Sequence, residues 1–115
     1  MTIKGTDLYY QLHSELCHVF TSPKRLEIID LLRDGEHSVQ QLGEMTGIPQ
    51  ANLSQHLAIL RQQKMVETRR DGTCVYYSIA DRRLVKALDL VKKMLVERIK
   101  VEGRMAAELA VEMKK

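Results

Sequence analysis

Side chains able to read DNA gather in one stretch of the chain, PQANLSQHLAILRQQ, which begins at Pro49. Asn and Gln can form paired hydrogen bonds with adenine, while Ser and Arg bind phosphates or bases. A helix face that only meets water would also be polar, so composition alone leaves both interpretations open. The chain from Ile48 to Val66, however, contains no acidic residue. An acid-free surface favours a phosphate-bearing partner over solvent.

Two adjacent arginines, Arg69 and Arg70, precede the dipeptide Asp71-Gly72, which favours a tight β-hairpin turn. From the tip of a hairpin, arginine side chains reach the phosphate backbone or the minor groove. The alternative is a solvated pair of charges beside a loop. Because the polar stretch lies just upstream, the sequence favours the DNA interpretation.

Apolar residues at helical spacing predict two helices that precede these residues. Ser22 is expected to cap the second helix, with Pro23 in its first turn, and Asp34-Gly35 is expected to end it. The first helix is expected over about residues 6–19, on Leu8, Leu12, Leu16 and Val19.

A short third helix and a fourth helix follow, joined by a turn. Ser38 and Gln41 form a capping-box pattern at the start of the third helix, and Gly47 is expected to end it. Two helices joined in this way form a helix-turn-helix, whose second helix lies in the major groove. The fourth helix is predicted over about 49–63, with an inward face made of Leu53, Leu57 and Leu60.

Beyond Met65 the pattern changes to strands around Asp71-Gly72, which predicts a hairpin over 66–79. Asp81 is expected to cap a long last helix. Its apolar stripe runs for about 29 residues, or more than ~40 Å, so one small domain cannot cover it and a partner helix is expected. The stripe comprises Leu84, Leu88, Val91, Leu95, Ile99, Ala106, Leu109 and Met113, with an interruption at Glu102.

The expected fold is mainly α with a small β-hairpin, a winged helix-turn-helix with a long C-terminal dimerisation helix. With 44% hydrophobic but only 4% aromatic residues, the core must consist of Leu, Ile, Val and Met, which suits helix packing. The net charge of +3 mildly favours a polyanionic partner. Residues 1–115 are expected to form a single domain, with the helix-turn-helix at 38–63, the wing at 66–79 and dimerisation helices at 1–20 and 81–115.

Other classes of protein find little support. No secretory signal or membrane span is recognisable, and the two cysteines form no pair motif, so a cytoplasmic protein is expected. The chain has no phosphate-binding loop, nucleophile elbow or carboxylate pair, so neither an enzyme nor a cofactor is expected. The alternative is a winged helix that serves only protein–protein assembly. Such a module needs neither an acid-free helix nor an arginine wing.

Three segments of the chain resemble, in order and spacing, the ArsR/SmtB family of bacterial and archaeal repressors. They are FTSPKRLEIIDLL, SVQQLGEMTGIPQANLSQHLAILRQQKMVE and RRDGTCVYYSIAD. The resemblance extends roughly from Val19 to Leu95. It implies a homodimer that binds double-stranded, pseudo-palindromic operator DNA and blocks transcription until an effector weakens binding. The motifs that carry it are Pro23-x-Arg25, Leu53-Ser54-x-His56-Leu57 and Asp71-Gly72 with Val75-x-Tyr77.

The resemblance also implies which residues contact DNA. His56 lies near the inward edge of its helix, so packing or capping is an alternative role for it. The implied contacts are Gln50, Asn52, Ser54, Gln55 and His56 on the recognition helix, Ser38 and Gln40 at the start of the preceding helix, and Arg69 and Arg70 on the wing.

The metal-sensing positions of the family lack their usual ligands in this chain. Zinc prefers nitrogen and sulfur ligands, so no metal site is expected. Ser38 and Gln40 stand where the family has two thiolates; on the last helix Asp81 and Glu97 match two carboxylates, but Arg83 and Met94 replace two imidazoles.

Cys17 and Cys74 are the remaining candidates for an effector site, through thiol oxidation or persulfide formation. Cys17 shares a helix face with His13, so both could join a group of a partner chain around a soft metal. The alternative for Cys17 is a buried free cysteine, which is common. Cys74 lies beside the wing turn, where we expect exposure and where oxidation would alter DNA contact. The effector itself stays unidentified.

Overall fold

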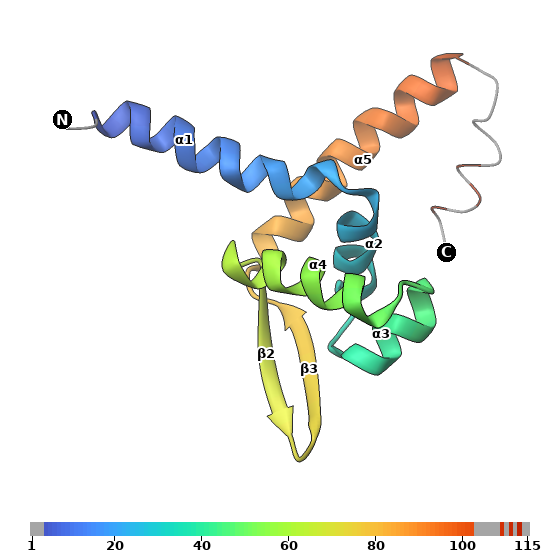
Figure 1. Cartoon of the computed structure of the whole chain (residues 1–115). Helices are drawn as coiled ribbons and strands as arrows, with labels where there is room; N and C mark the ends of the chain where they lie inside the picture. The colour runs from blue at the N-terminus through green and yellow to red at the C-terminus, as the bar shows by residue number, and fades with distance from the viewer. Residues whose placement is uncertain (1–3, 103–108, 110, 112, 114–115) are drawn as a thin grey trace. The chain divides into compact units, whose positions relative to one another are not determined.

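The computed structural model in Figure 1 describes residues 4–102 together with residues 109, 111 and 113. The chain divides into two compact units between Asp81 and Arg82, and each is described by itself. The first unit contains α1 (Gly5–His18), the 3-10 helix η1 (Val19–Thr21), α2 (Pro23–Leu32), β1 (His37–Ser38), α3 (Val39–Thr46), α4 (Gln50–Gln62), β2 (Val66–Asp71) and β3 (Cys74–Ile79). In the second unit the structure describes α5 (Arg82–Glu102). The predicted fold class, a mainly α winged helix-turn-helix, is confirmed.

The start of α2 follows from two adjacent residues, as predicted. Ser22 has extended backbone angles, and its Oγ accepts a hydrogen bond from the backbone N–H of Arg25 at 3.3 Å. Pro23 takes the first helical position, where a backbone N–H would have no partner within the helix. The helix ends at Leu32, two residues before the predicted stop.

The predicted capping box at the start of α3 is also confirmed. The Oγ of Ser38 accepts a hydrogen bond from the backbone N–H of Gln41 at 3.1 Å, and the Oε1 of Gln41 accepts one from the N–H of Ser38 at 2.9 Å. At the other end Gly47 adopts a left-handed conformation with φ of 72°. Glycine is the residue that takes this conformation without a steric cost, so it ends the helix.

The wing belongs to a three-stranded antiparallel sheet with the order β1-β3-β2. Sequence analysis predicted the β2–β3 hairpin but not β1, because two residues are too few to show a strand-like alternation. β1 pairs His37 with Tyr77 and Ser38 with Tyr76. The wing is therefore joined through its backbone to Ser38, the residue that caps α3.

The hairpin turn is shifted by one residue from the prediction. Asp71 is the last residue of β2 and pairs with Cys74, so the loop consists of Gly72 and Thr73. Gly72 has a φ of 62°, as glycine does at the first loop position of type II′ turns. Such turns require a positive φ at their first loop residue only, so the glycine stands first and Asp71 stays in the strand.

The core of the first unit lies where α2, α3 and α4 pack together. All three leucines predicted to face inward from α4 belong to it. Full burial of one leucine contributes about 2 kcal/mol, so α4 is held firmly by one face while the opposite face remains available. The core side chains exposed by no more than 2% are Val19, Ile28, Ile29, Leu32, Leu42, Leu53, Leu57 and Leu60.

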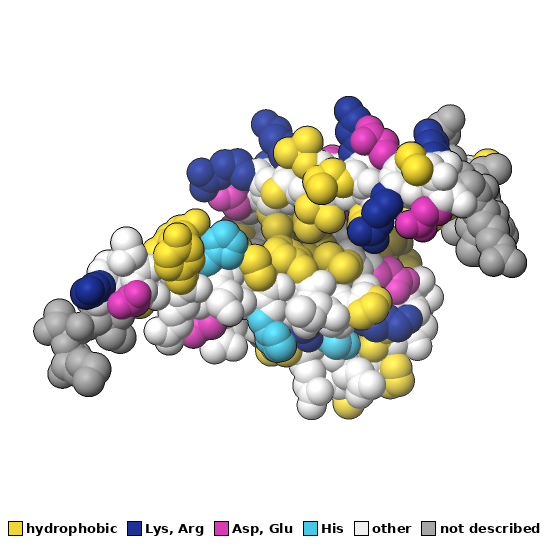
Figure 2. Space-filling view, turned by 90° about the horizontal axis from the view of Figure 1, so that it is seen from above, with side chains coloured by type: hydrophobic (Ala, Val, Ile, Leu, Met, Phe, Trp, Pro, Cys, Tyr) yellow, Lys and Arg dark blue, Asp and Glu magenta, His cyan; other side chains and the backbone are white. Residues whose placement is uncertain are grey.

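Helix α1 has no buried residue, although many of its side chains are apolar. Figure 2 shows hydrophobic side chains on its surface. Leu8, Leu12 and Leu16 recur every four residues and so share one side of the helix. An exposed apolar stripe of this kind marks an interaction site more often than a face in contact with water alone. The large apolar residues concerned are Leu8, Tyr9, Tyr10, Leu12 and Leu16, which are 40–68% exposed.

Helix α5 begins directly after Asp81, as predicted, and is described to Glu102. The predicted continuation of its stripe through Ala106 lies outside the described residues. Among the described residues, no helix is long and apolar enough to cross a membrane. The large apolar residues most exposed on α5 are Leu90, Val91, Met94, Leu95 and Val101.

Candidate nucleic-acid interface

Helix α4 has a buried side and an exposed side that differ in chemistry. Leu53 and Leu57 are 1% exposed and fix the helix to the core. The first turn contains no acidic residue, and the N-terminus of a helix attracts negative charge. The exposed edge of α4 therefore suits an anionic partner. The predicted contact residues exposed on it are Gln50, Asn52, Ser54 and Gln55.

A groove of about 720 Å³ lies between the helix-turn-helix and the wing. It brings together predicted contact residues from the start of α3 and from α4, and the turn of the wing completes it. Polar side chains, the carboxylate of Glu44, one thiol and several apolar side chains thus line a single surface. The lining residues concerned are Ser38, Gln40, Gln50, Ser54, Thr73 and Cys74; Asn52, Gln55, His56, Arg69 and Arg70 are not among the lining residues.

His56 is half-buried and turned toward the protein. Its Nδ1 lies 3.4 Å from Nη1 of Arg25. A guanidinium can only donate, so Nδ1 accepts this contact. Partial burial and the nearby charge of Arg25 lower the pKa of His56. The geometry supports the packing role considered for His56, and a DNA contact by its ring stays a prediction.

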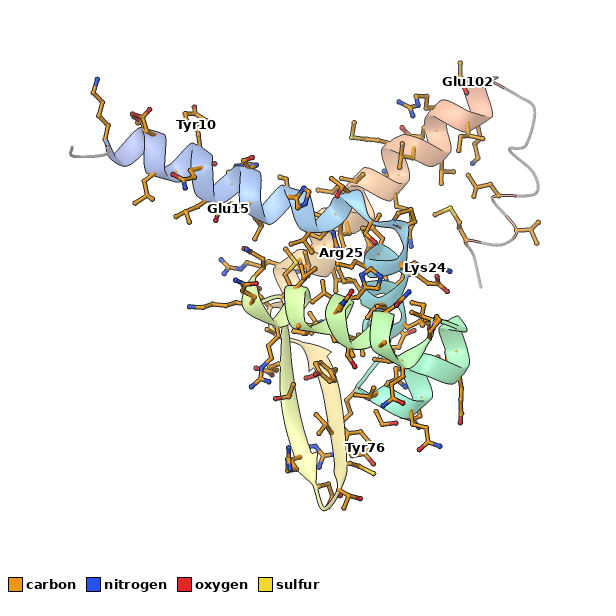
Figure 3. All side chains as sticks on the ribbon, in the orientation of Figure 1. Tyr10, Glu15, Lys24, Arg25, Tyr76 and Glu102 are labelled. Atoms are coloured by element: carbon orange, nitrogen blue, oxygen red, sulfur yellow. The ribbon has the colours of Figure 1, made fainter. Side chains whose placement is uncertain are left out.

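Arg25 is the buried centre of this contact, with 8% exposure. Its Nε donates to the backbone oxygen of Val19 at 2.8 Å and its Nη2 to that of His18 at 3.4 Å. Figure 3 labels Arg25 at this junction of α1, α2 and α4. The motif Pro23-x-Arg25 contained the residue, but local spacing does not indicate which distant groups a buried arginine contacts.

Arg69 is engaged by other residues of the protein. Its Nε and Nη2 donate to the two carboxylate oxygens of Glu36 at 3.1 and 2.6 Å, and its guanidinium carbon lies 4.6 Å from the centre of the Tyr76 ring. The hydrogen bond from Arg69 lowers the pKa of Glu36, and Glu36 in turn raises that of Arg69. Sequence analysis missed Glu36, because its partner lies 33 positions away. DNA contact by Arg69 stays a prediction.

Arg70 follows Arg69 on β2, so its side chain points to the opposite face of the strand. It is exposed, and within the part of the chain that the structure describes its side chain has no hydrogen bond or ion pair. Its charge is available to a phosphate.

Both cysteines are free and exposed. The exposure of Cys74 beside the turn is as predicted, and the residue also lines the groove. Cys17 is exposed on α1, so the alternative in which it is a buried free cysteine is wrong for the single chain. His13 places its Nδ1 3.1 Å from the hydroxyl of Tyr9. Among the described residues, no group of three or more His, Cys, Asp and Glu side chains could hold a metal ion.

Sequence comparisons point to one family of regulators. The family model of the bacterial regulatory proteins of the arsR family matches residues 22–68, from the cap of α2 into β2. An uncharacterized HTH-type transcriptional regulator of Mycobacterium tuberculosis, Rv0081, is 36% identical over 87 residues, which cover 75% of this chain and 76% of the relative. The biofilm growth-associated repressor of Xylella fastidiosa is 36% identical over 81 residues, which cover 70% of this chain and 68% of the relative.

Solved structures agree with these relatives. The crystal structure of Rv0081 matches with a TM-score of 0.77 at 32% identity and covers 84% of this chain and 97% of that chain. The NMR structure of Mb0332 from Mycobacterium bovis, a homodimeric winged helix-turn-helix DNA-binding domain, matches with a TM-score of 0.76 at 28% identity and covers 84% and 90%. With this fold, this exposed helix edge and these relatives, the chain belongs to the ArsR family of bacterial regulatory proteins and is a DNA-binding transcriptional regulator.

Proposed function

We propose that this regulator is a homodimeric repressor that binds double-stranded operator DNA, with α4 in the major groove and the wing on the adjacent backbone. The observation that carries the proposal is the exposed, acid-free edge of α4, which Leu53 and Leu57 fix to the core. In a helix-turn-helix this edge is the part that reaches base pairs.

The amide side chains of α4 are assigned to base edges. Gln50, Asn52 and Gln55 are exposed near the start of the helix, and an amide can pair bidentately with adenine. Each good pair of this kind discriminates by about 1–3 kcal/mol against the wrong base.

The residues around the groove are assigned to the DNA backbone. Ser38, Gln40 and Ser54 offer polar groups there. On the wing, Arg70 is exposed, and its side chain has no partner among the residues that the structure describes. Arg69 and His56 complete the predicted set. Because both already contact other side chains of the protein, we assign them to positioning the wing and α4.

Dimerisation is supported by the uncovered apolar surface of α1. Leu8, Leu12 and Leu16 recur every four residues and are all exposed, so a second copy can cover them. The M. bovis relative is homodimeric. A two-fold dimer would place two recognition helices on the two halves of a pseudo-palindromic operator.

Repression follows if the dimer occupies the operator and excludes the transcription machinery, in keeping with the repressor of Xylella fastidiosa. The effector that ends repression stays unassigned. The exposed thiols of Cys17 and Cys74 are the candidates for it.

The test begins with binding to a random-sequence duplex at rising salt. Neutralisation of phosphates releases counterions, so the logarithm of affinity should fall linearly with the logarithm of salt concentration, by about 0.9 per phosphate contact. An affinity that is independent of salt would contradict the proposal and favour the assembly-module alternative.

A sequence selected from a random pool then tests base readout. Asn52→Ala and Gln55→Ala should each weaken binding to the selected sequence about tenfold or more, with little change on random DNA. Gln62→Ala, at the far end of the same helix, is the matched control and should change neither. Equal losses on both kinds of DNA would mean that α4 does not read bases.

A further inference from the structure

A bidentate ion pair joins the wing to the segment that precedes α3. Arg69 on β2 presents two N–H groups to the two carboxylate oxygens of Glu36, at 3.1 and 2.6 Å. This geometry fixes the direction of both side chains as well as their distance. Since the two residues are 33 positions apart, the pair restrains two elements relative to each other.

The sheet register places the ion pair beside Tyr76, a residue of the central strand β3 that pairs with both β1 and β2. Tyr76 on β3, labelled in Figure 3, is the cross-strand partner of Arg69 on one side and of Ser38 on the other. The Arg69 guanidinium lies over the Tyr76 ring in a cation–π contact. Because Ser38 caps α3, the pair stands next to the residue that begins the helix-turn-helix.

The backbone connection at this place is short. β1 contributes only two residues to the sheet, and a two-stranded hairpin alone is marginally stable in water. The ion pair and the ring contact therefore add a side-chain restraint where the backbone ladder supplies little.

The same pair limits what Arg69 can offer to DNA. Two of the five N–H groups of Arg69 already donate to Glu36, and its Nη1 lies 3.9 Å from Oδ2 of Asp71. Both carboxylates repel a phosphate that approaches Arg69. The Glu36 carboxylate is ionised at neutral pH, because the hydrogen bond from Arg69 lowers a pKa that is ordinarily already well below 7. Arg70 lies on the other face of β2 and has no side-chain partner among the described residues.

We propose that Glu36 and Arg69 are positioning residues that fix the wing against the start of α3, and that Arg70 alone of the two wing arginines contacts phosphate. The inference rests on the proposed function, because it concerns how the wing meets DNA. It differs from the expectation that both arginines bind DNA directly.

The first experiment reverses and then restores the pair. Arg69→Glu should weaken binding to a random-sequence duplex about threefold or more, because two carboxylates then repel each other at the base of the wing. The exchange variant Glu36→Arg/Arg69→Glu restores an ion pair and should return the affinity to within about twofold of the original protein. Its net charge equals that of the original.

A matched control separates the pair from the added charge. Asp34→Arg/Arg69→Glu has the same net charge as the exchange variant, but its new arginine stands two positions away from Glu36. We expect this control to stay weak. Both paired side chains are about half exposed, 53% for Arg69 and 40% for Glu36, so the variants should fold.

Amide hydrogen exchange of the free protein tests, without DNA, whether the Glu36–Arg69 ion pair holds the wing against the start of α3. We call this ion pair the brace. The backbone amides that pair β1 with β3 should lose protection in Arg69→Glu, regain it in the exchange variant and remain unprotected in the Asp34→Arg control. A protection pattern that is the same in all variants would overturn the brace.

The salt dependence distinguishes the two arginines. Arg70→Gln should reduce the slope of the logarithm of affinity against the logarithm of salt by about 0.9 per wing, or about 1.8 for the dimer, whereas Arg69→Gln should leave the slope unchanged. A reduced slope in Arg69→Gln, or an exchange variant no better than the Asp34→Arg control, would overturn the proposal. Failure of the proposed function looks different: the original protein itself would show no salt-dependent binding, while hydrogen exchange would still report on the brace.

Discussion

His56 and Cys74 show how single residues can connect the recognition surface to solution conditions. His56 lies on α4, and its ring contacts the permanently charged Arg25 on α2. The thiol of Cys74 lines the groove together with Gln50 and Ser54. A change in charge at either residue acts directly on α4 or on the surface next to it.

Acidification should destabilise the protein in part through His56. Its pKa is lowered in the folded protein, so the unfolded chain binds the proton more readily. The contribution of His56 to the free energy of unfolding is therefore complete above its ordinary pKa of about 6.5 and is lost as the pH falls through the lowered one. In urea denaturation, His56→Gln should lose less stability than the original protein between pH 7.5 and 5.5. An equal loss in both would show that other groups dominate.

A charge placed on Cys74 should weaken DNA binding. Carboxymethylation by iodoacetate adds a negative charge in the groove, and one unit charge about 4 Å from a phosphate costs about 1 kcal/mol in water, or about fivefold in affinity. Iodoacetamide adds a neutral group of similar size and should have a smaller effect. Cys74→Ser should abolish the difference between the two reagents, and Cys17→Ser should preserve it. A difference that follows Cys17 would place the sensitive thiol on α1.

At the scale of the element, α3 illustrates how glycine placement sets the helix-turn-helix. Gly43 lies within the helix, where an added Cβ would meet Leu53 Cδ2 at 3.7 Å, an ordinary contact. Gly47 follows the helix with a φ of 72° and open space around it. An added Cβ has room at both glycines. The backbone differs, because Gly43 has a helical conformation that alanine favours, whereas Gly47 has a left-handed conformation that alanine disfavours.

Alanine at the two positions should shift stability in opposite directions. Gly43→Ala should stabilise the protein by about 0.5–1 kcal/mol, because alanine favours the helix and reduces the entropy of the unfolded chain. Gly47→Ala should destabilise it by about 1–2 kcal/mol, because alanine pays the steric cost of the left-handed conformation. Chemical denaturation measures both. A Gly47→Ala variant as stable as the original would mean that this turn adopts another conformation in solution.

At the scale of the whole molecule, the uncovered apolar face of α1 is the basis for assembly. Leu12 is 54% exposed in the single chain. Leu12→Glu should dissociate the dimer, as sedimentation equilibrium would show, and should weaken operator binding by about a hundredfold through loss of the second half-site. Ser14→Glu adds the same charge to another face of α1 and should do neither. Dissociation by Ser14→Glu but not by Leu12→Glu would place the interface elsewhere.

Local features of this protein were largely readable from the chain. The caps at Ser22 and Ser38, the end of α3 at Gly47 and the inward leucines of α4 each depend on residues within about four positions of one another. Such interactions are decided by backbone geometry that any helix shares. The sequence by itself therefore determined the order of the helices, the presence of the wing and the polar edge of α4.

Tertiary structure alone decided which distant side chains meet. Three contacts join residues that are 31 or more positions apart in the chain. They are the pairing of β1 with β3, the ion pair between Glu36 and Arg69, and the contact of Arg25 with His56. No local periodicity encodes these partners, because a charged side chain has the same appearance in a sequence whether it faces solvent or a distant carboxylate. Only once the helices and the sheet have packed does the geometry show that Arg69 is engaged by Glu36, whereas the side chain of Arg70 has no partner within the described part of the chain.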